Sequence, residues 1–253
     1  MRESLNLRFK YVVATSGFFV AHNIPKANYM IKHPEKYDDV KCYRMACKIM
    51  NHMRRRSRTK TNVYGTENIP EENCILFSNH QGKYDALGIL LGFNKPCGVL
   101  FDKKQGNRLV TKQTVGLLRG EIIDLGDMKD VVKTIRNVGK KVKDGMNFLI
   151  FPEGGYTDNK NELQKFQSGC FDCSLKSKKP ILPVVIYDSY KSMNSNSFKK
   201  VITQVHFLKP IYFDEYGHMN KTEIAELVKG RIKEKLDMIK NKDKKVYLSK
   251  KIK

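Results

Sequence analysis

Short continuous apolar runs alternate with segments of helical period along most of this chain. The runs are typical of strands buried on both faces of a sheet: CILF at 74–77, CGVLF at 97–101 and PILPVVIY at 180–187. Between them, residues 128–144 place apolar side chains on one helical stripe, at Val131, Ile135, Val138 and Val142. Because strands that alternate with helices form sheets covered on both faces, the pattern predicts an α/β fold with a mostly parallel sheet flanked by helices.

The same patterns predict the remaining elements. We expect further helices at 35–56, 84–91 and 220–240, and further strands at 120–125, 147–151 and 201–207. Asp127 is the expected N-cap of the helix at 128–144, and Gly145 is its expected C-terminal stop. Asn220 followed by Glu223 resembles a capping box that opens the last helix.

The charge balance of the chain is strongly basic. Lys and Arg number 48 against 26 Asp and Glu, a formal net charge of +22, so the chain attracts nucleic acid, an anionic membrane surface or phosphorylated substrates. Only charge supports nucleic acid, because the sequence lacks zinc-finger spacing, a helix-turn-helix pattern and an RNP-like aromatic run. The lone pair Cys170 and Cys173 does not supply the four ligands of a closed zinc site, so we expect no metal and reduced thiols.

The N-terminal region joins an apolar segment to a cluster of arginines. Residues 11–24 are apolar but fall short of the ~20 residues that span a bilayer. A helix lying in the membrane interface and an ordinary core helix both fit them, and the segment alone favours the core helix. Arg54, Arg55, Arg56 and Arg58 are more than a helix C-terminus needs, so they fit either a solvated helix end or a functional basic surface.

Polar side chains follow the run at 74–77, where the predicted strand ends. His80 and Asp85 have a spacing that turns side chains by about 140° in a continuous helix, so they meet only if His80 lies in the turn before the helix and Asp85 one turn inside it. Gly82 favours such a turn, because glycine accepts backbone angles that other residues avoid. Since open α/β sheets bind ligands at the carboxyl ends of their strands, the spacing predicts a His–Asp pair at a ligand site.

Four motifs together resemble a known family. NHQGKYD at 79–85, RGEIID at 119–124, FPEGG at 151–155 and ILPV at 181–184 are similar, in order and spacing, to the sequence blocks of the glycerolipid acyltransferases. That family includes the lysophosphatidic acid acyltransferases. The resemblance covers about residues 60–190.

The resemblance implies a role for each motif. His80 acts as a general base, which fits an imidazole that takes the proton of an attacking hydroxyl, and Asp85 orients the imidazole and stabilises the imidazolium. No serine or cysteine nucleophile is required, because the acceptor hydroxyl itself attacks. Glu153 is expected to contact the glycerol hydroxyl or to organise basic neighbours. The substrate-binding residues of these motifs are expected to be Asn79, Phe151, Pro152, Glu153, Gly154 and Gly155.

The sequence departs from the family pattern at two positions. Leu125 follows Asp124 where the second block commonly carries arginine, and Gly155 and Tyr156 stand where the third block commonly continues with threonine and arginine. Both missing arginines suit bidentate recognition of phosphate. The candidates to replace them are Lys103, Lys104, Arg119 and Lys165, of which we expect the first three to bind substrate.

The resemblance predicts an acyltransferase that moves a fatty acyl group from acyl-CoA or acyl carrier protein to the free hydroxyl of 1-acyl-glycerol-3-phosphate, giving phosphatidic acid, with no cofactor. Another lysophospholipid or lipid alcohol is an alternative acceptor, and a basic nucleic-acid-binding protein is the alternative of another class. A peripheral or monotopic enzyme on the cytoplasmic face of the cell membrane accounts for both the basic charge and the motifs. We therefore expect an anionic membrane surface as a partner and no nucleic acid. We expect a helical membrane-surface segment at 1–58, the α/β acyltransferase domain at 59–240 and a loosely held lysine-rich tail at 241–253.

Overall fold

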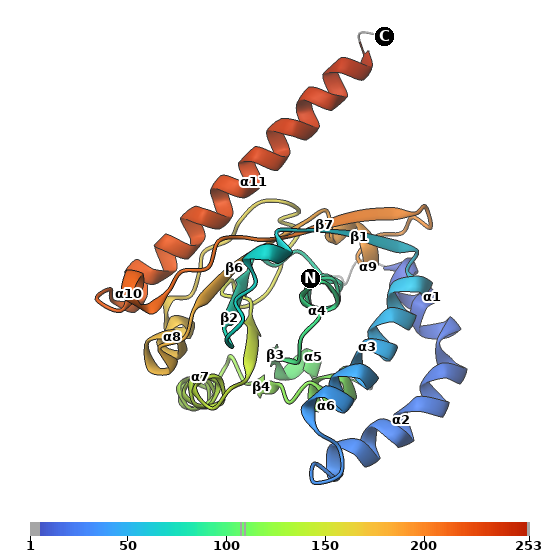
Figure 1. The fold of residues 1–253 in the computed structure, drawn as a ribbon. Coiled ribbons are helices and arrows are strands. Elements are labelled where there is room, and N and C mark those ends of the chain that lie inside the picture. Colours follow the sequence, from blue (N-terminus) through green and yellow to red (C-terminus); the bar gives the residue numbers. More distant parts are fainter. Residues whose placement is uncertain (1–5, 107, 109, 252–253) are drawn as a thin grey trace.

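A seven-stranded sheet forms the centre of the molecule, in the order β1-β7-β6-β2-β5-β3-β4 (Figure 1). The computed structural model describes residues 6–251 except Asn107 and Leu109. The strands are β1 (Thr59–Tyr64), β2 (Ile75–Ser78), β3 (Cys97–Asp102), β4 (Glu121–Ile123), β5 (Asn147–Ile150), β6 (Ile181–Tyr187) and β7 (Val201–Phe207). Neighbouring strands are parallel except β6 and β7, so the predicted mostly parallel sheet is confirmed.

The strands β2, β5 and β6 lie at the buried centre of this sheet. Every residue of β2 and β6 is buried, and Ile75 pairs with Phe148 on one side and with Ile181 on the other. Helices cover both faces, so these strands carry continuous apolar runs instead of the alternation typical of a half-exposed sheet.

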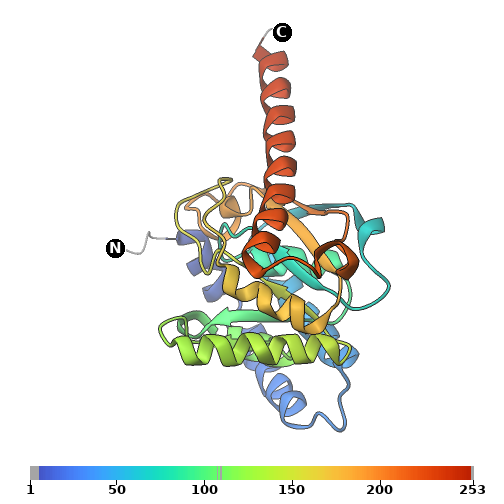
Figure 2. The same ribbon diagram turned by 90° about the vertical axis from the view of Figure 1, so that its left-hand side faces the viewer.

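The helices lie in two layers on opposite faces of the sheet (Figures 1 and 2). One layer contains α2 (Gly17–Lys32), α3 (Asp39–Arg56), α4 (Asp85–Phe93) and α6 (Thr111–Leu117), with α1 (Leu7–Thr15) against α2 and α3. The other contains α7 (Met128–Lys143), α8 (Asp172–Ser177) and α11 (Lys221–Lys251). Shorter helices connect these elements: α5 (Lys103–Gly106), α9 (Tyr190–Met193), α10 (Phe213–Tyr216) and the 3-10 helices η1 (Thr66–Asn68) and η2 (Ser168–Phe171).

The caps predicted from the sequence are confirmed. Asp127 accepts hydrogen bonds from the backbone N–H groups that open α7, and Gly145 follows this helix with a positive φ of 107°. Asn220 and Glu223 bond reciprocally at the start of α11. Local side chain to backbone bonds therefore set these boundaries as the sequence indicates.

Some boundaries differ from the predicted ones. The helix expected at 35–56 begins at Asp39, because the Asp38 side chain accepts the N–H of Lys41 and acts as its N-cap. The strand β1 was not expected, since its sequence TKTNVY is largely polar. It pairs with β7 at the edge of the sheet, where most of its side chains are not buried and polar residues are tolerated.

The last helix is longer than the sequence analysis predicted. A helix to about residue 240 and a loosely held tail at 241–253 were expected, but α11 continues to Lys251 and projects beyond the body of the molecule (Figure 1). Lysine is a good helix former, and residues 231–251 contain no glycine or proline to end the helix. The predicted end of the helix near residue 240 is therefore too early.

The N-terminal segment forms two helices, α1 and α2, in place of the one considered at 11–24. The guanidinium of Arg8, 1% exposed, donates to the backbone carbonyls of Lys191 and Lys199 and so fastens α1 to the chain before β7. Within residues 6–251, excluding the two undescribed positions, none of the helices combines the length and apolar character needed to cross a bilayer.

Candidate active site

Two of the sequence motifs meet at the carboxyl edge of the sheet. The strand β2 ends at Ser78, and a turn then leads to Asp85, the first residue of α4. Its neighbour β5 runs parallel to it and ends at Ile150, just before the segment 151–155. The pairing of β2 with β5 therefore brings His80 and the FPEGG motif to one place, as the sequence predicts for strand ends of an α/β sheet.

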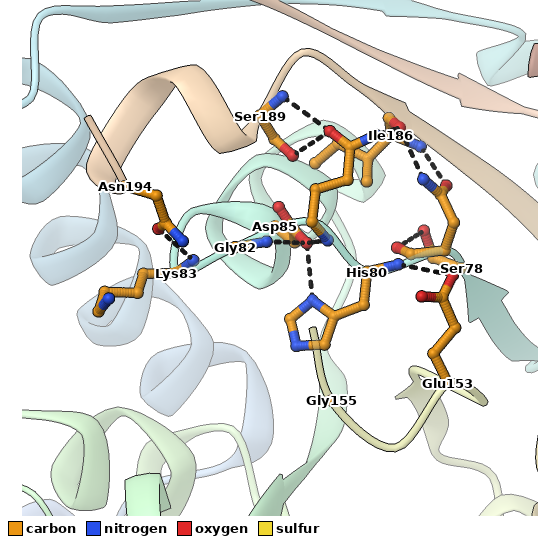
Figure 3. A network of polar contacts seen from close by, with 12 residues as sticks. Ser78, His80, Gly82, Lys83, Asp85, Glu153, Gly155, Ile186, Ser189 and Asn194 are labelled. Atoms are coloured by element: carbon orange, nitrogen blue, oxygen red, sulfur yellow. Dashed lines mark hydrogen bonds and ion pairs between the residues drawn. The ribbon is translucent and has the colours of Figure 1, made fainter. Parts of the chain in front are cut away.

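His80 and Asp85 form a direct pair (Figure 3). The Nδ1 atom of His80 lies 2.7 Å from Oδ2 of Asp85, and the same carboxylate oxygen accepts the backbone N–H groups of Gln81 and Gly82. The Asp85 side chain is fully buried, whereas 18% of the His80 side chain is exposed. Because the buried carboxylate is an acceptor, Nδ1 carries the proton and Nε2, which points away from Asp85, keeps its lone pair.

The turn between them differs in detail from the predicted one. Asp85 is the first residue of α4 and does not lie one turn inside the helix. Gly82 does not adopt a positive φ, so backbone freedom is not why glycine stands there. A Cβ at this position would lie 2.8 Å from Oδ1 of Asn194, and that oxygen also accepts the N–H of Lys83. A side chain at position 82 would displace the Asn194 side chain from its bond to Lys83.

Two aromatic rings hold the imidazole in place. The ring of Phe151 stacks on His80 with centroids 4.2 Å apart, and Tyr156 meets it edge-on at 4.7 Å. These contacts fix the ring plane and shield part of it from water. Tyr156 stands where the family pattern commonly carries arginine, so in this chain that position packs against His80.

Glu153 supports the turn that carries His80. Its carboxylate accepts the backbone N–H of His80 at 3.2 Å and the side-chain amide of Gln164 at 2.6 Å. Burial raises the pKa of Glu153, although these hydrogen bonds oppose the shift. No basic side chain bonds it within the part of the chain that the structure describes, so this geometry gives Glu153 a positioning contact in place of the expected organisation of cations.

The backbone after Glu153 is open. Gly154 has a φ of 71°, which a side chain would strain, and a Cβ on Gly155 would meet no atom within 4 Å. The preceding Pro152 is buried and its carbonyl accepts the N–H of Gln167. The two glycines thus leave the backbone open between Phe151 and Tyr156, whose rings contact His80, as expected for a backbone that a substrate approaches.

Several amides that the sequence analysis did not single out complete the site. Gln81, 1% exposed, accepts hydrogen bonds from the backbone and hydroxyl of Ser189 and donates to Asn161 and to Ile186. The Asn159 side chain donates to the carbonyl of His80. These bonds join positions far apart in the sequence and leave no local pattern, so no signal in a single sequence indicates them.

Asn79, predicted to bind substrate, pairs with the sheet. Its side chain donates to the carbonyl of Ile186 and accepts the N–H of the same residue, both at 2.9 Å. It is 2% exposed. Asn79 therefore extends the pairing of β2 with β6 and fixes where the turn that carries His80 begins.

The basic residues predicted for the phosphate site are divided between two edges of the sheet. Lys103 and Lys104 follow β3 at the same edge as His80, and Lys103 forms an ion pair with Asp124 at 3.0 Å, which lowers the pKa of that carboxyl. Lys165 is exposed in the chain after the FPEGG motif. Arg119 precedes β4 at the amino edge and bonds Asp39 and the carbonyl of Tyr37, so the structure does not bring it to His80.

The arrangement supports general-base chemistry on an incoming hydroxyl. It offers an oriented imidazole, a buried counter-charge and the open backbone of Gly154 and Gly155 in the segment that contacts the ring. Within the described residues, no group of three or more His, Cys, Asp or Glu is placed to hold a metal ion.

Comparisons with known proteins agree with this geometry. A family model described as Acyltransferase matches residues 60–187. The 1-acyl-sn-glycerol-3-phosphate acyltransferase of Borreliella burgdorferi is 29% identical over 186 residues, which cover 70% of this chain and 72% of that protein. The protein of the same name from Saccharomyces cerevisiae is 27% identical over 184 residues, which cover 70% of this chain and 60% of that protein.

A solved structure shares the fold. The 1-acyl-sn-glycerophosphate (LPA) acyltransferase PlsC from Thermotoga maritima matches with a TM-score of 0.73 at 20% identity, over 93% of this chain and 95% of that chain. The family model includes both His80 with Asp85 and the FPEGG motif, and it spans more than half of the sequence. This chain therefore belongs to the acyltransferase family.

Proposed function

We propose that this protein transfers a fatty acyl group from a thioester donor to the free hydroxyl of 1-acyl-glycerol-3-phosphate, giving phosphatidic acid for phospholipid synthesis. The observation that carries the proposal is the His80–Asp85 pair, whose imidazole packs against Phe151 and Tyr156, the residues at the two ends of the glycine-containing segment. The names of the similar proteins indicate the same acceptor.

The chemistry follows from the geometry of the pair. A lone pair of the acceptor hydroxyl attacks the thioester carbon while Nε2 of His80 takes the hydroxyl proton. Collapse of the tetrahedral intermediate forms the ester and breaks the C–S bond, and the leaving thiolate receives the proton from His80. Asp85 keeps the proton on Nδ1 and stabilises the imidazolium between these steps.

Either acyl-CoA or an acylated carrier protein supplies the thioester in this proposal, with no further cofactor. For the acceptor, Lys103 and Lys104 are the predicted cations that lie at the same sheet edge as His80. Both are lysines, so each offers a phosphate a point charge and not the fork of arginine. Acceptor binding through these lysines is part of the proposal.

A second acceptor class is favoured by one observation. Tyr156 occupies the position of a common arginine and packs on His80, and Leu125 occupies that of the other. A lysophospholipid or lipid alcohol without a phosphomonoester would not require those arginines. The alternative keeps the same base and the same bond-forming step.

We further propose that the enzyme works as a peripheral or monotopic protein on an anionic membrane, at the cytoplasmic face of the cell membrane. Phe18 is 90% exposed, and Tyr11 and Val13 are exposed on α1. A groove of about 370 Å³ between α2 and α3 is lined by both Phe18 and Arg56, so apolar and cationic groups share one surface. That combination suits the boundary between headgroups and acyl chains.

One assay tests the acceptor. Purified protein is given a labelled acyl donor and a panel of lysolipids with and without a phosphomonoester. The proposal predicts a kcat/KM for lysophosphatidate above that of every lysolipid lacking the phosphomonoester. Equal activity on both groups would favour the second acceptor class, and tight nucleic-acid binding without acyl transfer would favour the basic nucleic-acid-binding alternative.

A further inference from the structure

The outer face of α7 carries an unusual row of cations. The row consists of Lys129, Lys133, Arg136 and Lys140, whose spacing of four, three and four residues places them on one stripe of the helix. All four are exposed. Among the residues that the structure describes, none of the four forms an ion pair or a side-chain hydrogen bond. Their charges are therefore available to a partner.

Apolar side chains lie within this row. Met128 is 71% exposed and Val132 is 44% exposed, and both lie on the same face of α7 as the four cations. The nearby Leu125 is 46% exposed. Three aspartates, Asp124, Asp127 and Asp130, lie at the Met128 end of the helix, and the cations extend along the helix beyond them. An apolar strip beside such a row of cations has the composition of a protein-docking surface, in which apolar burial contributes affinity and charge raises the association rate and the selectivity.

The position of α7 relates this face to the active site. The helix begins just after the carboxyl end of β4, so its Met128 end lies at the sheet edge that holds His80. Lys103 and Lys104, at the end of the neighbouring strand β3, lie at the same edge. The row of cations thus starts at the edge where acyl transfer takes place.

The face also points away from the proposed membrane surface. The helix α7 lies on the opposite side of the sheet from α1, α2 and α3, and in Figure 2 it lies in front of the sheet with no other element over it. When the N-terminal helices contact lipid, the outer face of α7 turns toward water. This favours a soluble partner over a lipid surface.

We propose that the outer face of α7 docks an acidic carrier protein that delivers the acyl group as a thioester. The proposal rests on the acyl-transfer function proposed above and specifies its donor. The row spans 12 residues of helix, about 16 Å from the first to the last, which matches an acidic helix or strip on a folded protein better than one phosphate group. The negative surface of the carrier pairs with the row while its acyl arm reaches the carboxyl edge.

The test compares two donors on the full-length enzyme, with lysophosphatidate in detergent as acceptor. One donor is palmitoyl-CoA, and the other is an acyl carrier protein of net negative charge loaded with palmitate. The test variant carries Lys133→Glu and Arg136→Glu. The matched control carries Lys209→Glu and Lys221→Glu, the same change of charge at two exposed lysines outside α7.

The test variant is expected to raise the KM for the acylated carrier roughly tenfold with little change in kcat, because reversed charges oppose the encounter. Its KM for palmitoyl-CoA should stay at the wild-type value, which also shows that the variant is folded. The control variant should resemble the wild type with both donors. Added salt should raise the wild-type KM for the carrier, since it screens exposed charges.

Several results would overturn the docking proposal. One is an unchanged carrier KM in the test variant, and another is an equal rise with both donors. A third is lost binding to anionic vesicles with unchanged carrier kinetics, which would assign the face to lipid. A wild-type enzyme that uses palmitoyl-CoA but not the carrier would refute this proposal alone. One that acylates no lysolipid from either donor would refute the proposed function with it.

Discussion

His80 is held through its ring and through its backbone. Asp85 fixes the ring nitrogen, Phe151 and Tyr156 fix the ring plane, and the chain after β5 bonds the backbone on both sides. The N–H of His80 is bonded by Glu153 and its carbonyl by Asn159. Preorganisation of this kind matters because a general base must meet its proton within hydrogen-bond reach.

Glu153 is predicted to act through His80 and not through its charge. Glu153→Ala leaves the buried N–H of His80 without an acceptor, which costs about 1–3 kcal/mol of stability and should lower kcat. Glu153→Gln keeps an acceptor oxygen for the N–H of His80 but loses the acceptor for the Gln164 amide, which is held by Gly155 and Thr157, so part of the kcat should return. Steady-state kinetics and urea unfolding of both variants provide the measurement. An inactive but fully stable Glu153→Gln would show that the carboxylate charge itself is required.

At this scale, the sequence predicts the residues whose chemistry is local. The His80–Asp85 pair and the glycines after Glu153 were predicted from spacing and residue type, and the family match covers both. Asn79 and Gln81 could not be assigned, because their bonds reach Ile186 and Ser189, more than 100 residues away. Arg119 could not be excluded from the phosphate site either. Its position at the opposite edge of the sheet from His80 becomes known only when the pairing of the strands is known.

At the scale of elements, strong apolar periodicity predicted the helices and central strands, whereas the polar strand at the edge of the sheet was not predicted. The helix α7 and the central strands lie where the apolar pattern predicts them. The strand β1 is polar because it lies at the edge of the sheet, and its pairing with β7 leaves no sequence signal. The extra length of α11 depends on helix propensity alone, which a search for apolar periodicity overlooks.

The pairing of β1 with β7 is predicted to weaken in acid through His206. This side chain is 7% exposed, stacks on Tyr64 and donates to Gln204. Burial, with help from Lys235, lowers the pKa of His206 from 6.5 to about 4. The folded state therefore holds the neutral imidazole, and its stability contribution is complete above pH 6.5 and is lost as the pH falls toward 4.

The shift corresponds to at most about 3 kcal/mol, by the conversion of a pKa difference into free energy. His206→Gln removes the titrating group, so this variant should lose less stability than the wild type between pH 7 and pH 5. Urea unfolding at both pH values measures the difference. Identical losses in the two proteins would exclude His206 as a source of acid sensitivity.

At the scale of the whole molecule, basic charge is distributed over two opposite faces. The arginines at the end of α3 lie on the side of α1 and α2, and the row on α7 lies on the other side of the sheet. The sequence shows the total charge of +22 but not this division, which depends on the order of the strands. Two separate basic faces allow one to meet lipid and the other to meet a soluble partner.

Binding to vesicles is predicted to require anionic lipid and to weaken with salt, because apolar contact and charge attraction must act together. Replacing Arg54, Arg55, Arg56 and Arg58 by glutamine should reduce sedimentation with anionic vesicles. The same variant should keep wild-type turnover on detergent-dispersed substrate, since these arginines lie outside the site. The membrane proposal would fail if the wild type did not bind anionic vesicles at low salt and instead bound DNA or RNA tightly.

The central claim is that His80 is the base of acyl transfer to a lysophosphatidate. The most direct measurement is the formation of labelled phosphatidic acid by the wild type and by His80→Ala, with His218→Ala as a control at an exposed histidine outside the motifs. Loss of a positioned general base should reduce kcat by about 10²–10⁴-fold, while the control keeps wild-type activity. A folded His80→Ala enzyme that forms phosphatidic acid at close to the wild-type rate would contradict the mechanism.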